Sequence, residues 1–230
     1  MSTIAERLEE VRARIAKAAA ACGRSADEIQ LVAVSKTKPE AAIREAYDAG
    51  QRDFGENYAQ ELASKAEALA DLEYLRWHFI GHLQSNKAKL VAHAAHVVHT
   101  VDSVGLAREL GKRAEKEERG SVHPRMPVLV EVNVGGEVQK HGVLSTDLEE
   151  VLDAVEKESA LHLEGLMTMP PPDLALARRA FESVVSLRNL HGGPTRLPRL
   201  SMGMSHDLEV AVACGSTMVR VGSAIFGERA

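Results

Sequence analysis

A lysine closes the segment Leu31-Val32-Ala33-Val34-Ser35-Lys36, whose other residues suit a strand buried in a parallel sheet. Pro39 follows shortly and opens a helical pattern, so we expect Lys36 at the carboxyl end of that strand. Burial of an unpaired ammonium is unfavourable, and its usual relief is a lowered pKa. A neutral amine in a sheltered pocket can attack a carbonyl carbon and form a Schiff base. The segment alone also allows a lysine that only extends its charge to water at the rim of the sheet.

Two short segments late in the chain combine glycine with serine: Ser201-Met202-Gly203 and Gly222-Ser223. Glycine lets backbone N–H groups approach an anion closely, and the serine hydroxyls can donate further hydrogen bonds. A short helix beginning at Gly222 would direct its positive end toward the same place. Either segment alone could equally be an ordinary tight turn. The two together favour a phosphate-binding site.

Arg220 lies between Val219 and Val221, in a pattern typical of a buried strand. A guanidinium stays charged in proteins, so an arginine in a central strand needs a partner. One interpretation is a salt bridge with Asp102 or Glu131. The other is a hydrogen bond from the guanidinium to a ring nitrogen or a carboxylate of a ligand.

Three histidines, His93, His96 and His99, are spaced three residues apart, which invites a metal-site interpretation. They span the expected end of a helix and the start of a strand, where no single periodicity places all three on one face. We therefore predict that the chain has no metal site, and that these histidines lie scattered at surfaces and interfaces.

The composition excludes several classes of protein. The chain has 230 residues, a net charge of -5 and only 3% aromatic residues, so it offers neither the basic surface nor the stacking platforms of nucleic-acid-binding proteins. Cys22 and Cys214 lie far apart, as in proteins of the reduced cytosol. Charges such as Glu6 and Arg7 argue against a signal peptide, and no apolar run approaches the roughly 20 residues of a membrane span. We expect a cytoplasmic protein that binds neither nucleic acid nor membrane.

Hydrophobic periodicity predicts eight strands, most of them followed by a helix. The strands are expected over residues 31–36, 51–54, 77–80, 96–101, 127–134, 161–167, 200–203 and 218–221. An extra amphipathic helix over 3–22 precedes them, and further helices are expected over 39–49, 104–118, 146–158, 173–191 and 205–213. Eight such units in about 200 residues favour a TIM-type (β/α)8 barrel, an α/β fold, over an open doubly wound sheet. We therefore predict a single domain over residues 1–230.

In such a barrel the functional site lies at the carboxyl ends of the strands, and the loops after the seventh and eighth strands commonly hold a phosphate. The two glycine–serine segments occupy those loops, so we expect them to meet Lys36 and Arg220 at one end of the barrel. A lysine on the first strand, a phosphate cup and a buried arginine together describe a site for pyridoxal 5′-phosphate (PLP).

Several longer motifs resemble the pyridoxal phosphate homeostasis protein family. They are Val34-Ser35-Lys36-Thr37-Lys38-Pro39, Phe54-Gly55-Glu56-Asn57-Tyr58, His78-Phe79-Ile80-Gly81-His82-Leu83-Gln84-Ser85-Asn86-Lys87 and Ser201-Met202-Gly203-Met204-Ser205. The resemblance runs nearly end to end and includes Arg220-Val221-Gly222-Ser223-Ala224-Ile225-Phe226-Gly227. It implies a barrel similar to the amino-terminal domain of alanine racemase.

The resemblance also implies roles for individual residues. Lys36 matches the lysine that forms the internal aldimine, and Arg220 matches the residue that faces the pyridine nitrogen. Asn57 and His82 match positions that line the cofactor ring. Lys140, in the glycine-rich loop after the fifth strand, resembles a family lysine thought to accept cofactor secondarily. The phosphate cup matches Ser201, Met202, Gly203, Gly222 and Ser223.

Two functions remain open from the sequence. The family resemblance implies a protein that binds PLP, keeps its supply in balance without robust turnover, and passes it to apo-enzymes. The alternative is a PLP-dependent amino-acid racemase, which needs acid–base groups on both faces of the substrate α-carbon. Barrel racemases take one such group, a tyrosine, from an additional carboxyl-terminal domain, whereas the tyrosines here are Tyr47, Tyr58 and Tyr74. We therefore expect a monomeric carrier of PLP rather than an enzyme.

Overall fold

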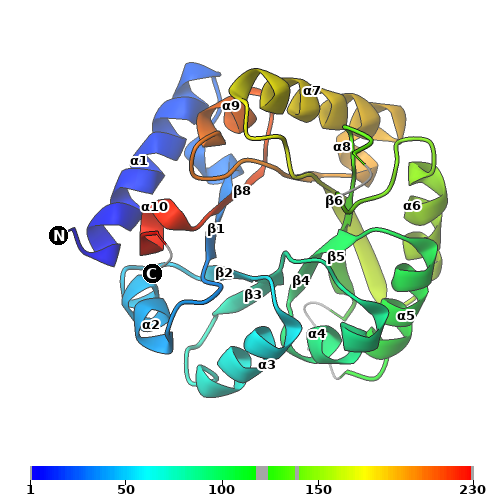
Figure 1. Ribbon diagram of the computed structural model, residues 1–230, viewed down its shortest axis with the longest axis horizontal. Helices are drawn as coiled ribbons and strands as arrows, with labels where there is room; N and C mark the ends of the chain where they lie inside the picture. The colour runs from blue at the N-terminus through cyan, green and yellow to red at the C-terminus, as the bar shows by residue number, and fades with distance from the viewer. Residues whose placement is uncertain (1, 118–123, 138–139, 229–230) are drawn as a thin grey trace.

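The computed structural model describes residues 2–117, 124–137 and 140–228. Eight parallel strands form a closed barrel in chain order, and the last strand pairs with the first (Figure 1). The strands are β1 (Gln30–Val34), β2 (Asp53–Glu56), β3 (Arg76–Phe79), β4 (Val97–Val101), β5 (Met126–Glu131), β6 (Leu161–Met167), β7 (Arg199–Ser201) and β8 (Met218–Val221). This architecture confirms the predicted TIM-type barrel.

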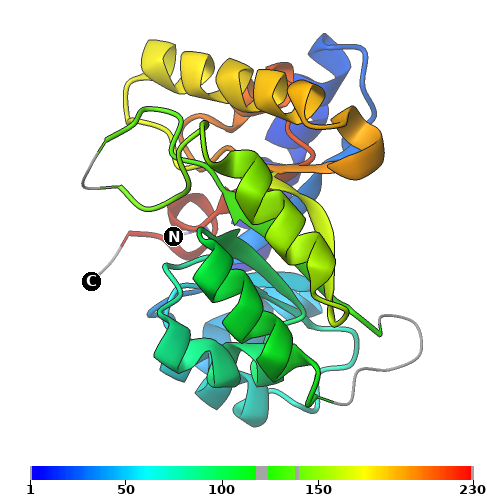
Figure 2. The ribbon, with the colours of Figure 1, turned by 90° about the vertical axis from the view of Figure 1, so that its right-hand side faces the viewer.

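Helices surround the barrel and connect its parallel strands, so they cover the outer face of the sheet (Figure 1). They are α2 (Glu40–Asp48), α3 (Ala59–Ala68), α4 (Ala88–Ala94), α5 (Val104–Ala114), α6 (Leu148–Lys157), α7 (Leu174–Leu190), α8 (Gly193–Arg196), α9 (Leu208–Ala213) and α10 (Ser223–Phe226), with two 3-10 turns, η1 (Ala26–Glu28) and η2 (Ser85–Lys87). The side view shows α5 and α6 next to each other on the outer surface (Figure 2). Over the described residues, no helix combines the length and the apolar character that a membrane span requires.

The predicted extra helix is present as α1 (Ile4–Ala21), which packs against α9 and α10 (Figure 1). It begins at Thr3, whose hydroxyl accepts a hydrogen bond from the Glu6 N–H while the Glu6 carboxylate accepts one from the Thr3 N–H. This capping box satisfies two backbone donors that a helix start otherwise leaves unpaired. Leu8, Val11 and Ile15 recur at helical spacing and are buried, so one face of α1 completes the outer core.

β1 ends two residues earlier than the sequence predicts. Its last residue is Val34, and the Ser35 N–H still bonds to the Gly55 carbonyl oxygen at 3.0 Å. The chain then turns, because Thr37 adopts a left-handed φ of 63°. Lys36 therefore lies on a tight turn just beyond the strand and not on the strand itself.

Three other strands differ from their expected ranges by two residues or more at one or both ends. β2 lies two residues beyond 51–54 and pairs with β3 along its whole length. β5 ends at Glu131 rather than at residue 134, because the Asn133 N–H bonds to the Val143 carbonyl oxygen at 2.9 Å, outside the barrel ladder. β7 stops at Ser201, because Gly203 has a φ of 100° and ends the extended chain.

Gly165 of β6 pairs with Arg199 of β7, and a Cβ at Gly165 would lie 1.9 Å from the Arg199 carbonyl oxygen. We expect Gly165→Ala to lower the free energy of unfolding by about 1–3 kcal/mol, since the neighbouring backbone must move to relieve the overlap. The matched control is Gly105→Ala in α5, where nothing lies within 4 Å, and alanine there should raise stability by about 0.5–1 kcal/mol. Urea denaturation of both variants measures the difference, and equal midpoints would contradict this steric account.

Candidate functional site

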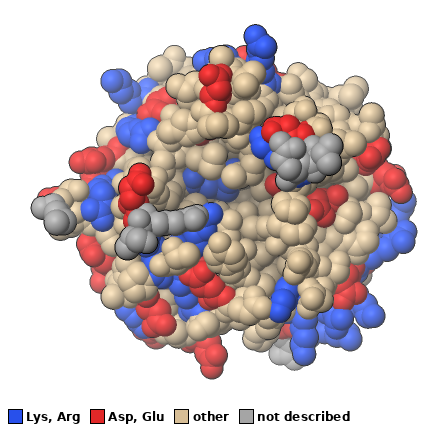
Figure 3. Space-filling view, viewed as in Figure 1, with Lys and Arg blue, Asp and Glu red and all other residues tan. Residues whose placement is uncertain are grey.

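Four of the predicted site residues line one cleft at the carboxyl ends of β1 and β8. Lys36, Arg220, Gly222 and Ser223 face a cavity of about 510 Å³. In the space-filling view, Lys and Arg atoms lie in a hollow near the centre of this face (Figure 3). The other lining residues are Val34, Lys38, Met204, Ser205, His206, Gly227 and Glu228. An amine, a guanidinium and a hydroxyl group therefore share this Lys36 cleft.

A buried ion pair holds the turn that carries Lys36. The Lys65 ammonium, from α3, donates to the Ser35 carbonyl oxygen and to the Glu56 carboxylate, both at 2.8 Å. The Ser35 hydroxyl donates to the same Glu56 oxygen at 2.6 Å. The residue before Lys36 is therefore tied to both β2 and α3.

The residue after Lys36 belongs to the same cluster through Glu61. The Glu61 carboxylate accepts hydrogen bonds from the Lys65 ammonium and from the Thr37 N–H, both at 2.6 Å. Burial raises the pKa of Glu56, against the opposing effect of the hydrogen bonds from Lys65 and Ser35. Removal of one partner of such a pair leaves an uncompensated buried charge, which is strongly destabilising. The Glu56–Lys65–Glu61 cluster thus fixes the backbone on both sides of Lys36.

The structure places Asn57 beside the Lys36 turn. Val34 pairs with Gly55, so Lys36 and Asn57, each two residues further along, follow β1 and β2 at the same level. Asn57 Oδ1 is buried, and no described residue donates a hydrogen bond to it. Gly81 packs behind it so closely that a Cβ there would lie 2.0 Å from the Asn57 carbonyl oxygen. Asn57 is absent from the cleft lining, and its contact with a cofactor ring stays a prediction.

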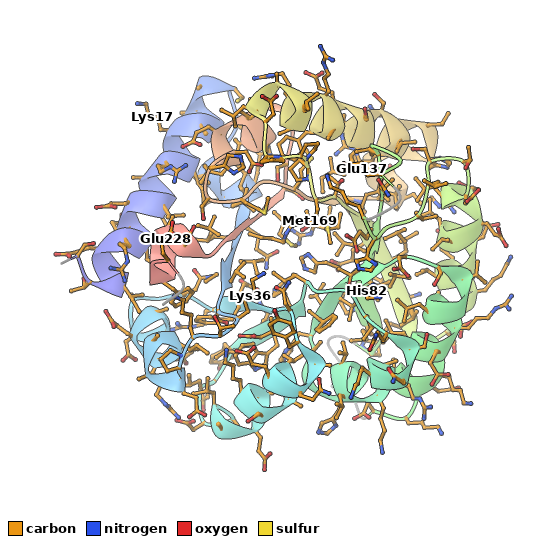
Figure 4. The ribbon with its side chains drawn as sticks, viewed as in Figure 1. Lys17, Lys36, His82, Glu137, Met169 and Glu228 are labelled. Atoms are coloured by element: carbon orange, nitrogen blue, oxygen red, sulfur yellow. The ribbon has the colours of Figure 1, made fainter. Side chains whose placement is uncertain are left out.

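His82 lies on another side of the barrel mouth from Lys36 (Figure 4). Its imidazole stacks on that of His141, with the ring centroids 3.6 Å apart and the planes at 9°, and its Nδ1 lies 3.5 Å from an Asp102 carboxylate oxygen. Within the described ranges, these three side chains form the one group close enough to share a metal ion. An ion bound to an imidazole lies near the ring plane, and two parallel stacked planes have no such point in common. The arrangement is therefore a stacked pair beside a carboxylate, and a role for His82 at a cofactor ring stays a prediction.

The part of the predicted phosphate cup that follows β7 is buried in the barrel wall. Ser201, Met202 and Gly203 do not line the Lys36 cleft, and the Ser201 and Met202 side chains are fully buried. A Cβ at Gly203 would lie 2.6 Å from the Ala211 Cβ, so glycine allows α9 to pack closely here. Direct contact of these three residues with a phosphate stays a prediction.

Ser205 is a lining residue that the sequence analysis did not select for the cup. Its hydroxyl accepts hydrogen bonds from the Ser223 hydroxyl at 3.2 Å and from the Ala224 N–H at 3.4 Å. It therefore joins the loops after β7 and β8 at the wall of the cleft. The signal in the sequence is a second serine two residues after Gly203, which closes the Ser201–Ser205 motif and begins the helix expected over 205–213.

The buried guanidinium of Arg220 is held by uncharged acceptors. Nη1 donates to the carbonyl oxygen of Ser201 at 2.6 Å and to its hydroxyl at 2.7 Å. Nη2 donates to the Thr168 carbonyl oxygen at 3.0 Å and contacts the Met169 Sδ at 3.2 Å. Burial lowers the pKa of Arg220 to about 10, so the group stays charged at neutral pH. These bonds, rather than a salt bridge to either carboxylate considered from the sequence, satisfy the charge.

Buried hydrogen bonds continue from Ser201 across the barrel interior. The Ser201 hydroxyl lies 2.9 Å from His99 Nδ1 on β4, and His99 Nε2 lies 2.9 Å from His78 Nδ1 on β3. His78 Nε2 lies 2.8 Å from Asp53 Oδ1, at the start of β2. We call the series from Arg220 to Asp53 the interior chain. Its members are 0% to 7% exposed, so the prediction that His99 lies at a surface or interface is wrong.

Comparison with known proteins identifies the family. The family described as "Alanine racemase, N-terminal domain" matches residues 7–230. The "Pyridoxal phosphate homeostasis protein" of Pseudomonas aeruginosa is 47% identical over 232 residues, which cover 100% of this chain and 97% of that protein. The protein of the same name from Escherichia coli is 44% identical over 234 residues, covering 100% and 98%. The chain belongs to the pyridoxal phosphate homeostasis protein family.

Solved structures similar to this chain extend the comparison. PipY of Synechococcus elongatus, solved with PLP bound, gives a TM-score of 0.79 at 38% identity and covers 98% of this chain and 100% of its own. The same protein without PLP gives a TM-score of 0.82. Alanine racemase from Corynebacterium glutamicum gives 0.65 at 18% identity, covering 96% of this chain and 62% of its own, a likeness that concerns the fold alone. The homeostasis family thus shares its barrel with this racemase.

A second cavity, of about 460 Å³, adjoins the Lys36 cleft in this homeostasis-family barrel. Glu131, Lys140 and Met169 are among its lining residues. Met169, labelled between Lys36 and Glu137 in Figure 4, also contacts Arg220, which lines the first cleft, so the two cavities meet at this contact. The Lys140 ammonium pairs with the Glu137 carboxylate at 2.5 Å. Secondary acceptance of cofactor by Lys140 stays a prediction.

Glu131 is a titratable group that the sequence analysis considered only as a salt-bridge partner. Burial raises its pKa to about 7, with Asp102 acting in the same direction and Arg220 opposing it. A carboxyl group with a raised pKa in the folded state stabilises the fold below its unfolded pKa of about 4.5. That contribution is lost as the pH rises through the folded value.

We expect the free energy of unfolding to fall by roughly 3 kcal/mol between about pH 4.5 and pH 8 because Glu131 ionises in a buried place. Glu131→Gln should remove this part of the pH dependence, since the amide does not titrate. Urea denaturation at a series of pH values measures both proteins. Glu9→Gln, at a side chain that is 76% exposed, is the control and should follow the wild type. A Glu131→Gln curve parallel to the wild type would show that Glu131 ionises normally.

Proposed function

We propose that this protein binds pyridoxal 5′-phosphate in the Lys36 cleft and acts as a carrier that keeps the supply of this cofactor in balance. The observation that carries the proposal is that the Lys36 amine, the Arg220 guanidinium and the Ser223 hydroxyl line one cavity. The names of the relatives and the PipY structure with PLP support it. When bound, the cofactor supplies an aldehyde that combines reversibly with amines.

The cleft fits the cofactor in size and in the chemistry of its two ends. Its volume of about 510 Å³ lies within the range of small-molecule sites, roughly 300–1,000 Å³. Ser205 and Ser223 would donate hydroxyl hydrogen bonds to the phosphate. Gly222 leaves the necessary space, because a Cβ there would already lie 3.3 Å from the Val34 carbonyl oxygen. The buried segment Ser201–Gly203 would support this cup from behind.

Arg220 would face the ring nitrogen of the cofactor. A guanidinium can only donate, so the ring nitrogen would be an unprotonated acceptor. PLP enzymes that need a full electron sink usually pair this nitrogen with a carboxylate, which keeps it protonated. An unprotonated ring withdraws electrons less strongly, which suits a carrier. Asn57 and His82 would lie along the ring, as the family resemblance implies.

The surroundings of the cleft support a carrier rather than a racemase. Racemisation needs a second acid–base group opposite the lysine. No tyrosine is among the cleft's described lining residues: Tyr58 and Tyr74 are 52% and 82% exposed, and the Tyr47 hydroxyl donates to the Glu73 carbonyl oxygen at 2.7 Å. We infer a monomeric cytoplasmic carrier that passes PLP to apo-enzymes without robust turnover.

Lys36 should carry the cofactor covalently. Borohydride reduction of the PLP-loaded protein, followed by peptide mapping, should place the pyridoxyl group on Lys36, because this amine opens into the cleft. Lys36→Ala should lose the yellow absorbance of the loaded protein, whereas Lys17→Ala, on the exposed face of α1, should keep it. Full absorbance in Lys36→Ala would refute this assignment.

One observation favours a second candidate function, amino-acid racemisation. Glu131, with a pKa of about 7, could exchange a proton near Arg220 at neutral pH. Exchange of the α-proton of L- and D-alanine in deuterated water, measured by NMR on the loaded protein, separates the two functions. We expect exchange near the rate of free PLP, together with faster reactivation of an apo-enzyme than free cofactor gives. Exchange at about 1 s⁻¹ or faster would make the protein an enzyme.

A further inference from the structure

The interior chain permits one fully bonded arrangement of its hydrogen atoms when both imidazoles are neutral. Arg220 has only donors, so the Ser201 hydroxyl oxygen accepts its N–H. At the other end an ionised Asp53 only accepts, so His78 Nε2 carries a hydrogen. His78 Nδ1 then accepts from His99 Nε2, and His99 Nδ1 accepts from the Ser201 hydroxyl. Every hydrogen bond therefore points from Arg220 toward Asp53.

The charges at the two ends fix this direction. Burial alone would raise the pKa of Asp53, but the hydrogen bonds from His78 and Arg76 outweigh it and lower that pKa. Asp53 also accepts a hydrogen bond from the Gln30 amide at 2.8 Å. Burial, with His78 and Arg220 acting in the same direction, holds the pKa of His99 well below its ordinary value, so His99 is neutral. An anion at one end and a cation at the other thus polarise the hydrogen-bonded groups between them.

We propose that His78 and His99 are positioning residues that, through Ser201, hold the Arg220 guanidinium in one orientation at the Lys36 cleft. His78 and His99 can act on Arg220 from a distance because the interior chain of hydrogen bonds begins on β2, β3 and β4 and crosses the barrel interior to β7 and β8. The Nη1 and Nη2 bonds of Arg220 leave its Nε–H for a ligand atom. That this atom is the PLP ring nitrogen rests on the proposed function, whereas the direction of the chain does not.

A substitution at Asp53, the end of the interior chain far from the cleft, should change how Arg220 is held at the cleft. If Asp53 were an amide, its NH2 group could donate to His78 Nε2 and reverse the imidazole hydrogens. His99 Nδ1 would then donate to Ser201, whose oxygen would accept two N–H groups while its own hydrogen lost its acceptor. The hold of Ser201 on Arg220 would weaken, although Asp53 lies at the opposite end of the barrel from the Lys36 cleft.

NMR of the PLP-free protein tests the direction of the chain by itself. With ¹⁵N-labelled histidine at pH 8, the imidazoles of His78 and His99 should both be neutral with the hydrogen on Nε2. His78→Gln and His99→Asn assign the two signals. In Asp53→Asn the hydrogens should move to Nδ1, or both forms should appear. A wild-type His99 that is cationic or carries its hydrogen on Nδ1 would overturn the proposal.

PLP titration and absorbance spectra test the effect on the cleft. His99→Leu should weaken PLP binding about tenfold and shift the absorption band, because Ser201 loses its acceptor. His99→Asn should stay within about threefold of the wild type, since its amide oxygen can replace the Nδ1 acceptor. A role in packing alone predicts equal losses for the two variants, and that result would overturn the proposal.

Two further variants make the binding test of the positioning role decisive. His93→Leu removes an exposed histidine of α4 and should bind PLP like the wild type. If His99→Leu does not fold, Asp53→Asn takes its place, with an expected loss of three- to tenfold in affinity, and an unchanged affinity and spectrum would count against positioning. If the wild type does not bind PLP, the proposed function fails, while the NMR result still decides the direction of the chain.

Discussion

The permanent charge of Arg220 inside the barrel is the constraint on which the interior depends. A guanidinium that has left water needs an acceptor for each hydrogen it presents, and apolar neighbours cannot supply one. Carbonyl groups at the ends of β6 and β7 and the Ser201 hydroxyl accept three of its five N–H groups, and the Ser201 hydroxyl is in turn hydrogen-bonded to His99. TIM barrels usually fill their centre with layers of branched apolar side chains. Here a line of polar groups replaces part of those layers.

Barrel closure makes the site. β1 and β8 lie at opposite ends of the chain, and their pairing sets Val32 beside Arg220 and Ala33 beside Val221. The turn after β1 and the loop after β8 therefore end at the same level, and the amine and the guanidinium share one cavity. The interior chain runs from β2, β3 and β4 to β7 and β8 across the closed barrel, so the same closure positions both the ligand-facing groups and their supports.

The sequence was sufficient to predict the architecture, because hydrophobic periodicity and strand count carry that information. It was also sufficient to predict that Lys36, Arg220, Gly222 and Ser223 lie together at one end of the barrel, because charged and glycine–serine residues are unusual at the ends of buried strands. It was less informative where the outcome depends on a turn. The φ of Thr37 moved Lys36 off the strand, and the φ of Gly203 exchanged Ser201 for Ser205 at the cleft wall. The interior chain could not be predicted, because its contacts join residues far apart in the chain and depend on the barrel register.

The Glu56–Lys65 pair beneath the Lys36 turn has a consequence for how this sequence can vary over generations. Loss of Lys65 leaves the Glu56 carboxylate buried without its counterion, and loss of Glu56 leaves the buried Lys65 ammonium with Glu61 alone, whereas exchange of a buried ion pair for apolar residues of matching volume is often neutral or stabilising. Single substitutions at these two positions therefore destabilise the fold, whereas a simultaneous substitution of both can be tolerated. The two positions should therefore co-vary among related sequences, either both charged or both apolar.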